Sequence, residues 1–214
     1  MTTLMSQVAR AGAPIGAARA AVILVHGRGA SAEGMLGLSD AFHAKDIAYV
    51  APQALSRSWY PYSFMEPIPR NEPYLSDALG TLSRVVGDLE SQGVPSERII
   101  LLGFSQGACL ALEFAARNAR RYGGVAGLSG GLIGPAGTPR NYQGSLVDTP
   151  VFLGCSDVDY HIPLARVHES TEVLRKLGGD VTEKIYPGMG HTIIEDEIDH
   201  VEAILRTIGA PENR

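Results

Sequence analysis

The amino-acid sequence predicts an α/β fold in which helices cover both faces of a mainly parallel central sheet. Short apolar runs alternate along the chain with helix-forming stretches, the pattern of strands joined by helices. Gly93 and the pair Gly178-Gly179 end two helical stretches, and Pro163 suits the start of another. With 214 residues and 45% hydrophobic content, we expect one domain over residues 1–214 without a large lid.

We expect a strand at each short apolar run, and a helix at each longer helix-forming stretch that follows such a run. The N-terminal segment 1–18 adds at most an antiparallel edge strand near residues 7–10. Strands are expected near residues 20–26, 47–51, 98–103, 123–128, 150–154 and 181–186. Helices are expected near residues 31–44, 73–92, 106–118, 163–178 and 193–208.

The most informative local pattern is Gly-Phe-Ser-Gln-Gly-Ala at residues 103–108, between an apolar run and a helix-forming stretch. It predicts a sharp strand-to-helix turn that exposes Ser105, since Gly103 and Gly107 leave room for the adjoining backbone. The turn places Ser105 at the positive end of a helix dipole, beside free backbone N–H groups. A glycine-rich helix start is the alternative, because a chain with 25 glycines produces such spacings by chance. The flanking strand and helix favour the nucleophile.

Candidate partners for this serine follow two later apolar runs. Asp157 and Asp159 come directly after the run 149–154, and His191 follows the run 181–186 in a glycine-bracketed loop. Functional groups gather at the carboxyl ends of parallel strands, so we expect these side chains at one edge of the sheet. The order serine, acid, histidine is that of a hydrolase triad. The residues alone leave the choice of acid open.

These motifs, together with His26-Gly27-Arg28-Gly29 and Leu128-Ser129-Gly130, resemble the phospholipase/carboxylesterase family of α/β-hydrolases, which includes acyl-protein thioesterase-like enzymes. The resemblance spans most of the chain and implies the α/β-hydrolase fold. In that family a helix-opening proline follows the acid by four residues, a pattern that Asp159 and Pro163 meet. Asp157 is then interpreted as a turn residue that accepts hydrogen bonds from local backbone N–H groups.

The resemblance also implies roles. Ser105 is expected as the nucleophile, His191 as the general base and Asp159 as its orienting acid. The backbone N–H groups of Arg28 and Gln106 are expected to form the oxyanion hole. Relatives of the thioesterases usually carry leucine at position 28, so we expect the arginine side chain to point to solvent, with contact to an anionic substrate group as the alternative. The mechanism requires no metal and no organic cofactor.

The insertion at residues 54–71 interrupts the alternation of strands and helices and carries Trp59, Tyr60 and Phe64 among prolines. Aromatic side chains in a loop between a strand and a helix line many ligand clefts, so we predict that these three bind substrate. Packing of the loop on the sheet edge is an equal alternative. His161 is interpreted as a helix-entry residue, with substrate contact as its alternative.

Composition limits the remaining classes of function. A net charge of −5 and the absence of a basic run interleaved with aromatics argue against nucleic-acid binding. Cys109 and Cys155 suit buried thiols of a reducing compartment. Residues 1–19 lack the apolar core of a secretory signal, and the run 20–25 is too short to span a bilayer. We therefore expect a cytoplasmic protein without integral membrane contact, with a homodimer as an open oligomeric state.

The leading functional hypothesis is a serine carboxylesterase acting through an acyl-enzyme on small or medium esters with an apolar acyl or aryl group. Alternatives with the same triad are a lysophospholipase, an acyl thioesterase and a lactone hydrolase of the dienelactone type. A remote alternative is a noncatalytic binding protein on the same fold. Such a protein is expected to lack a triad member or the oxyanion loop, and this sequence lacks neither.

Overall fold

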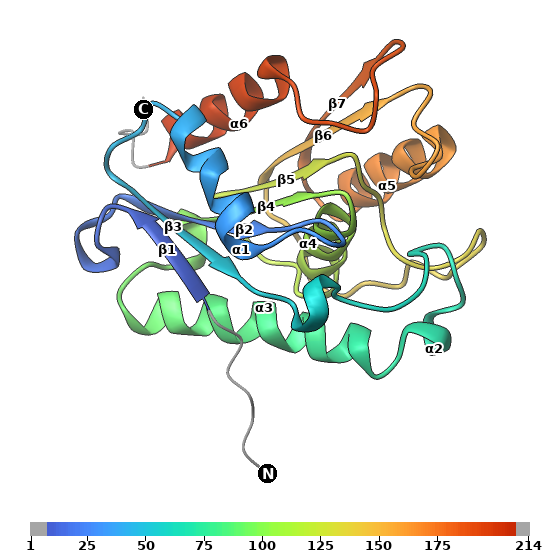
Figure 1. The fold of residues 1–214 in the computed structure, drawn as a ribbon, viewed down its shortest axis with the longest axis horizontal. Helices are drawn as coiled ribbons and strands as arrows, with labels where there is room; N and C mark the ends of the chain where they lie inside the picture. Colours follow the sequence, from blue (N-terminus) through green and yellow to red (C-terminus); the bar gives the residue numbers. More distant parts are fainter. Residues whose placement is uncertain (1–7, 209–214) are drawn as a thin grey trace.

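The computed structural model describes residues 8–208 and is built around a seven-stranded sheet (Figure 1). The strand order is β1-β3-β2-β4-β5-β6-β7, and every neighbouring pair is parallel except β1, which runs antiparallel to β3 at the edge. Gln7, where the edge strand was expected to begin, lies outside the described residues. The strands are β1 Val8–Gly12, β2 Ala20–Val25, β3 Ile47–Pro52, β4 Ile99–Phe104, β5 Gly124–Leu128, β6 Pro150–Ser156 and β7 Asp180–Tyr186.

The helices cover both faces of this sheet, as predicted (Figure 1). Alternate residues of the central strand β2 point to opposite faces: Ile23 and Val25 pack with α3, α4 and α5, whereas Val22 and Leu24 pack with α1 and α6. Burial on both faces explains why the strand reads as a continuous apolar run. The helices are α1 Ala32–Leu36, α2 Ile68–Asn71, α3 Tyr74–Ser91, α4 Gln106–Arg117, α5 Leu164–Lys176 and α6 Glu195–Thr207.

Two elements differ from expectation. The helix predicted over residues 31–44 is only five residues of α-helix, after which the backbone tightens into a 3₁₀ turn over Gly37–Ala41. Gly34 and Gly37 lower its helix propensity, so a long regular helix does not form there. The short helix α2 lies inside the insertion and was not predicted.

The strand order positions the functional loops. After β2 the chain adds β3 on one side of it and then crosses to the other side, where β4, β5, β6 and β7 follow in order. The neighbouring strands β2 and β4 therefore form a topological switch point. Ligands of open α/β sheets bind in the crevice at the carboxyl ends of such strands. The loop after β2 and the turn after β4 both lie at this point. Among helices in the described part of the chain, none has the length and apolar character needed to cross a membrane.

Candidate active site

Ser105 occupies the turn between β4 and α4 in a strained backbone conformation. Its φ of 55° and ψ of −121° lie in a region that residues with a side chain rarely adopt, at a cost of about 1–3 kcal/mol. A Cβ atom on Gly103 would lie 2.2 Å from the carbonyl oxygen of Gly107, and one on Gly107 would lie 2.0 Å from that of Val25. The close approach of α4 to β2 and β4 therefore admits only glycine at both positions.

Three side chains from three loops form a continuous line of hydrogen bonds. Ser105 Oγ donates to Nε2 of His191 over 2.8 Å, and His191 Nδ1 donates to Oδ2 of Asp159 over 2.6 Å. The serine follows β4, the aspartate follows β6 and the histidine follows β7. The structure thus brings together residues separated by 86 and 32 positions in the sequence.

Both oxygens of the Asp159 carboxylate accept hydrogen bonds. Besides the bond from His191 to Oδ2, Oδ1 accepts from the backbone N–H groups of His161 at 2.8 Å and Ile162 at 3.1 Å. Burial raises the pKa of Asp159, but the bond from His191 and the two backbone bonds outweigh it, so the pKa lies below its ordinary value. An ionised carboxylate here fixes the imidazole tautomer with its proton on Nδ1.

Asp157 lies two residues away but faces a different partner. Its exposed carboxylate accepts a hydrogen bond from the backbone N–H of Gly188 at 2.8 Å. The interpretation as an acceptor of backbone N–H groups therefore holds, but the restriction to local groups was wrong, because Gly188 belongs to the loop that carries His191. This contact between the acid and histidine loops has no local sequence signal.

The loop after β2 packs directly against Ser105. A Cβ atom on Gly27 would lie 3.4 Å from the Cβ atom of Ser105. Gln106 is the first residue of α4, so its N–H has no acceptor within the helix, and the N–H of Arg28 has no protein acceptor among the described residues. Both N–H groups, expected to act as the oxyanion donors, thus have no acceptor in the part of the chain that the structure describes.

His26 supports this loop as a buried neutral imidazole. Its Nδ1 donates to the carbonyl oxygen of Gly27 at 2.7 Å, which leaves Nε2 as acceptor for the backbone N–H of Ala54 at 3.1 Å. Burial lowers the pKa of His26, and the bond to Gly27 only partly opposes this effect. A protonated His26 would lose the bond from Ala54, so this loop requires the neutral form.

The side chain of Arg28 does not simply point to solvent. Its guanidinium donates to Ser58 Oγ at 3.0 Å, to the carbonyl oxygen of Pro61 at 2.9 Å and to that of Tyr62 at 2.8 Å. Arg28 is exposed, as expected, but its guanidinium is also bound to three loop oxygens, a pairing that was not predicted. Neither the arginine nor the loop shows this pairing in the sequence, since 30 to 34 residues separate them.

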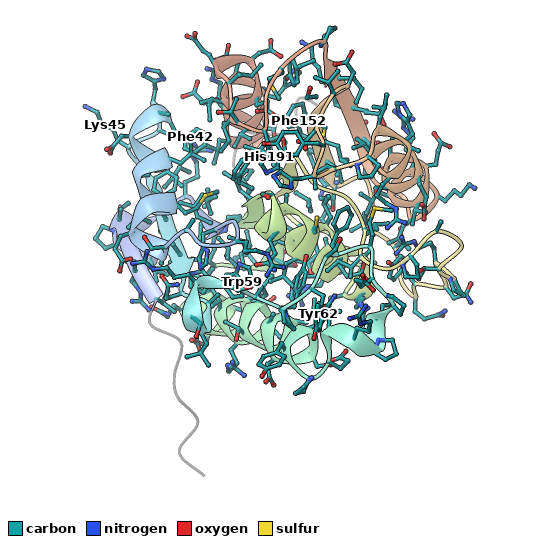
Figure 2. The ribbon with its side chains drawn as sticks, turned by 45° about the vertical axis from the view of Figure 1, so that its right-hand side comes forward. Phe42, Lys45, Trp59, Tyr62, Phe152 and His191 are labelled. Atoms are coloured by element: carbon teal, nitrogen blue, oxygen red, sulfur yellow. The ribbon has the colours of Figure 1, made fainter. Side chains whose placement is uncertain are left out.

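The three aromatic residues predicted to bind substrate are almost completely buried. Trp59 is 4% exposed, Tyr60 1% and Phe64 7%, and all three belong to the hydrophobic core. Trp59 Nε1 donates to the backbone carbonyl of His26 at 2.8 Å, so this ring holds the start of the loop after β2. In Figure 2, Trp59 and Tyr62 lie in the lower half of the view and His191 lies above them. Their burial favours the alternative, in which the loop packs against the sheet.

Two further rings, of Phe104 and His161, contact the imidazole of His191. The ring centre of Phe104 lies 5.0 Å from that of His191, and the exposed ring of His161 lies 4.8 Å from it on an edge. Tyr160 is 83% exposed and packs on His161 at 4.4 Å. His161 precedes α5, as expected, and its ring contacts the imidazole of His191. Its contact with substrate stays a prediction. Phe104 was missed, and its only signal is its place directly before the serine.

Comparison with known proteins agrees with this fold. A sequence model of the phospholipase/carboxylesterase family matches residues 7–208. The crystal structure of a phospholipase/carboxylesterase from Dyadobacter fermentans is 44% identical, covers 96% of this chain and 99% of its own, and superposes with a TM-score of 0.91. The crystal structure of esterase PE8 is 27% identical, covers 96% and 100% of the two chains, and has a TM-score of 0.79.

Two curated relatives are each named acyl-protein thioesterase 1. The protein of Saccharomyces cerevisiae is 27% identical over 92% of this chain and 96% of its own length. The protein of Gibberella zeae is 38% identical over 56% of this chain, and that match spans about half, 52%, of the relative. Since the family model matches residues 7–208 of 214, the chain belongs to the phospholipase/carboxylesterase family of α/β-hydrolases, serine hydrolases that act on ester bonds.

Proposed function

We propose that this protein is a carboxylesterase in which Ser105 is the nucleophile, His191 the general base and Asp159 the acid that orients the histidine. The observation that carries the proposal is the continuous line of two hydrogen bonds, 2.8 Å and 2.6 Å long, that joins the three side chains. A serine hydroxyl is a weak nucleophile and needs an adjacent base, which needs a third group to hold its tautomer. The two distances are within hydrogen-bonding range, which supports these roles.

The proposed reaction has two halves. Ser105 Oγ attacks the ester carbonyl carbon while its proton passes to Nε2 of His191, and the N–H groups of Arg28 and Gln106 bind the resulting oxyanion. The intermediate collapses, the C–O bond to the leaving group breaks, and the imidazolium protonates the departing alcohol. Water then attacks the acyl-serine with the same base, and the acid is released as the serine regains its proton.

The substrate is proposed to carry an apolar acyl or aryl group. Val158 and Tyr160, on the loop that carries Asp159, are large apolar side chains exposed at 61% and 83%. Phe104 adds an aromatic ring at 5.0 Å from the imidazole. Apolar surface around a few polar groups is typical of sites that bind such ligands.

Fluorophosphonate labelling tests the nucleophile. The native protein is expected to form one covalent adduct, and Ser105→Ala is expected to form none and to lose about a millionfold in kcat. Asp159→Asn is expected to retain the fold and lose about 10⁴-fold in kcat, because an amide favours the wrong imidazole tautomer. Asp157→Asn is the matched control and should keep most of its activity. A native protein that does not label would contradict the proposal.

A thioesterase is the second candidate, favoured by the name acyl-protein thioesterase 1 that both curated relatives carry. The same triad acts on thioesters, with a thiol as leaving group. A panel of p-nitrophenyl esters graded by chain length, an S-acylated peptide, a lysophospholipid and a lactone separates these candidates through kcat/KM. A preference for short esters supports the general esterase, and a preference for the S-acyl peptide supports the thioesterase.

We also propose a cytoplasmic location, supported by two buried cysteines, Cys109 and Cys155, that form no disulfide in the described residues. Fractionation of cells that express the protein at native levels checks this location. The homodimer stays a prediction, to be checked by sedimentation equilibrium.

A further inference from the structure

The two residues proposed to supply the oxyanion hole share a second feature. Both send their side chains to one segment of the insertion, residues 58–62. The Arg28 guanidinium holds Ser58, Pro61 and Tyr62 through three hydrogen bonds of 2.8–3.0 Å. The Gln106 carboxamide accepts from the N–H of Trp59 at 3.0 Å and donates to the carbonyl oxygen of Tyr60 at 2.8 Å.

The main chain beside Arg28 is attached to the same part of the insertion. The N–H of Gly29 donates to the carbonyl oxygen of Arg57 at 2.7 Å. On the other side, the carbonyl oxygen of His26 accepts from Trp59 Nε1 at 2.8 Å. The turn that carries the Arg28 N–H is therefore held at both ends and through its central side chain, while that N–H itself has no acceptor within residues 8–208.

The position of the donors matters because oxyanion stabilisation depends on geometry. A donor contributes fully only when it is already placed where negative charge develops. The planar guanidinium presents several donors in a fixed fork, so it can hold three oxygens that lie apart from one another. An aliphatic side chain has no donor, and an ammonium group carries its three donors on a single nitrogen.

We propose that the Arg28 side chain is a positioning residue: by attaching the turn 26–29 to the segment 58–62, it holds its own backbone N–H in the oxyanion hole. The inference rests on the proposed esterase function. It assigns a role to the side chain of Arg28, at the position where relatives of the thioesterases usually carry leucine. In this view the segment 58–62 is the rigid support of the hole, and Gln106 attaches the second donor to the same support.

The central test compares Arg28→Met, which keeps the backbone N–H and an aliphatic stem, with the wild type. Steady-state hydrolysis of p-nitrophenyl acetate and inhibition by a trifluoromethyl ketone, which forms a serine-bound oxyanion, are measured together. We expect kcat to fall at least about tenfold, the ketone inhibition constant to rise by a similar factor and KM to change less than about threefold. Arg28→Lys should recover part of the loss.

Lys45→Met is the control, because it removes an exposed cation that lies outside both the turn 26–29 and the insertion and makes no side-chain hydrogen bond among the described residues. It should leave kcat within about twofold of the wild type. Gln106→Ala offers a second route if Arg28→Met fails to fold, as monitored by circular dichroism. It breaks the bonds to Trp59 and Tyr60, keeps its own N–H, and should produce the same separation of kcat from KM.

Two results would overturn the inference. One is an Arg28→Met variant whose kcat and ketone inhibition constant both stay within twofold of the wild type. The other is a loss confined to KM for esters that carry a carboxylate, which would make Arg28 a substrate-binding residue instead. Either leaves the esterase function intact, since fluorophosphonate labelling of wild-type Ser105 reports on that function separately.

Discussion

The carboxylate of Asp157 and the backbone N–H of Gly188 form a hydrogen bond of 2.8 Å that joins two loops of the proposed active site. One loop follows β6 and carries Asp159, and the other follows β7 and carries His191. The two neighbouring acids thus have different partners. Asp159 binds the imidazole itself, and Asp157 holds the backbone that presents the imidazole.

Removing the outer acid should weaken activity moderately. Asp157→Ala loses one exposed hydrogen bond, so we expect kcat/KM to fall about fivefold, equivalent to roughly 1 kcal/mol. Asp157→Asn keeps an oxygen acceptor for Gly188 and should stay near the wild type. Ester hydrolysis by both variants checks the pair, and equal activity of the two would argue against the loop contact.

Acid should destabilise the protein through His26. Burial lowers the pKa of His26 below its ordinary value of 6.5, so the unfolded chain takes up a proton that the folded chain does not. The contribution of His26 to the free energy of unfolding is therefore complete above pH 6.5 and is lost as the pH falls towards the folded pKa. In urea titrations from pH 8 to 5, His26→Gln should lose less stability on acidification than the wild type, and an equal loss in both proteins would argue against His26 as the titrating group.

Glu197 should produce the opposite dependence on pH. Burial raises the pKa of Glu197 to about 7, opposed by the backbone N–H of Ile194 and assisted by Asp196. Only one of its oxygens is paired, with that N–H at 3.1 Å; the other faces Gly154 without a partner in the described residues. The folded chain keeps a proton that the unfolded chain loses, so stability falls as the pH rises from 4.5 through 7, by about 2–3 kcal/mol in total.

Glu197→Gln removes this titration and keeps an oxygen for the bond to Ile194. We expect the variant to be more stable than the wild type at pH 8 by about 2 kcal/mol, and to show little gain at pH 5. Glu195→Gln, on the same helical turn but exposed, is the control. Urea unfolding at both pH values measures the difference, and an equal effect at pH 5 and 8 would rule out titration of Glu197 as its cause.

Two glycine substitutions should have opposite effects on the free energy of unfolding. Gly107→Ala places its Cβ atom 2.0 Å from the carbonyl oxygen of Val25, within the backbone of the nucleophile turn, and should destabilise by at least about 3 kcal/mol or prevent folding. Gly87→Ala, inside helix α3 with no atom within 4 Å of the new methyl group, should stabilise by about 0.5–1 kcal/mol. Thermal unfolding of both variants gives the comparison, and a stable Gly107→Ala would show that the turn tolerates a side chain.

Much of the fold was predictable because its signals are local. Parallel strands buried on both faces appear as continuous apolar runs, so β2, β4 and β6 were visible from sequence, and glycine and proline marked several helix ends. The helix over residues 31–44 was overestimated, since a local pattern does not show where glycines convert α-helix into a 3₁₀ turn.

At the proposed active site, the sequence determined the chemical types and their order: a serine held between two glycines, an acid after the run 149–154, and a histidine in a glycine-bracketed loop. The choice of Asp159 over Asp157 came from the family resemblance. The sequence did not reveal the partners of Arg28, Gln106 and Asp157, nor the burial of Trp59. Those depend on long-range contacts between loops that only the completed sheet brings together. A turn depends on the geometry of a few consecutive residues, so the sequence predicts it. The contacts between side chains of different loops depend on tertiary packing, so only the folded structure shows them.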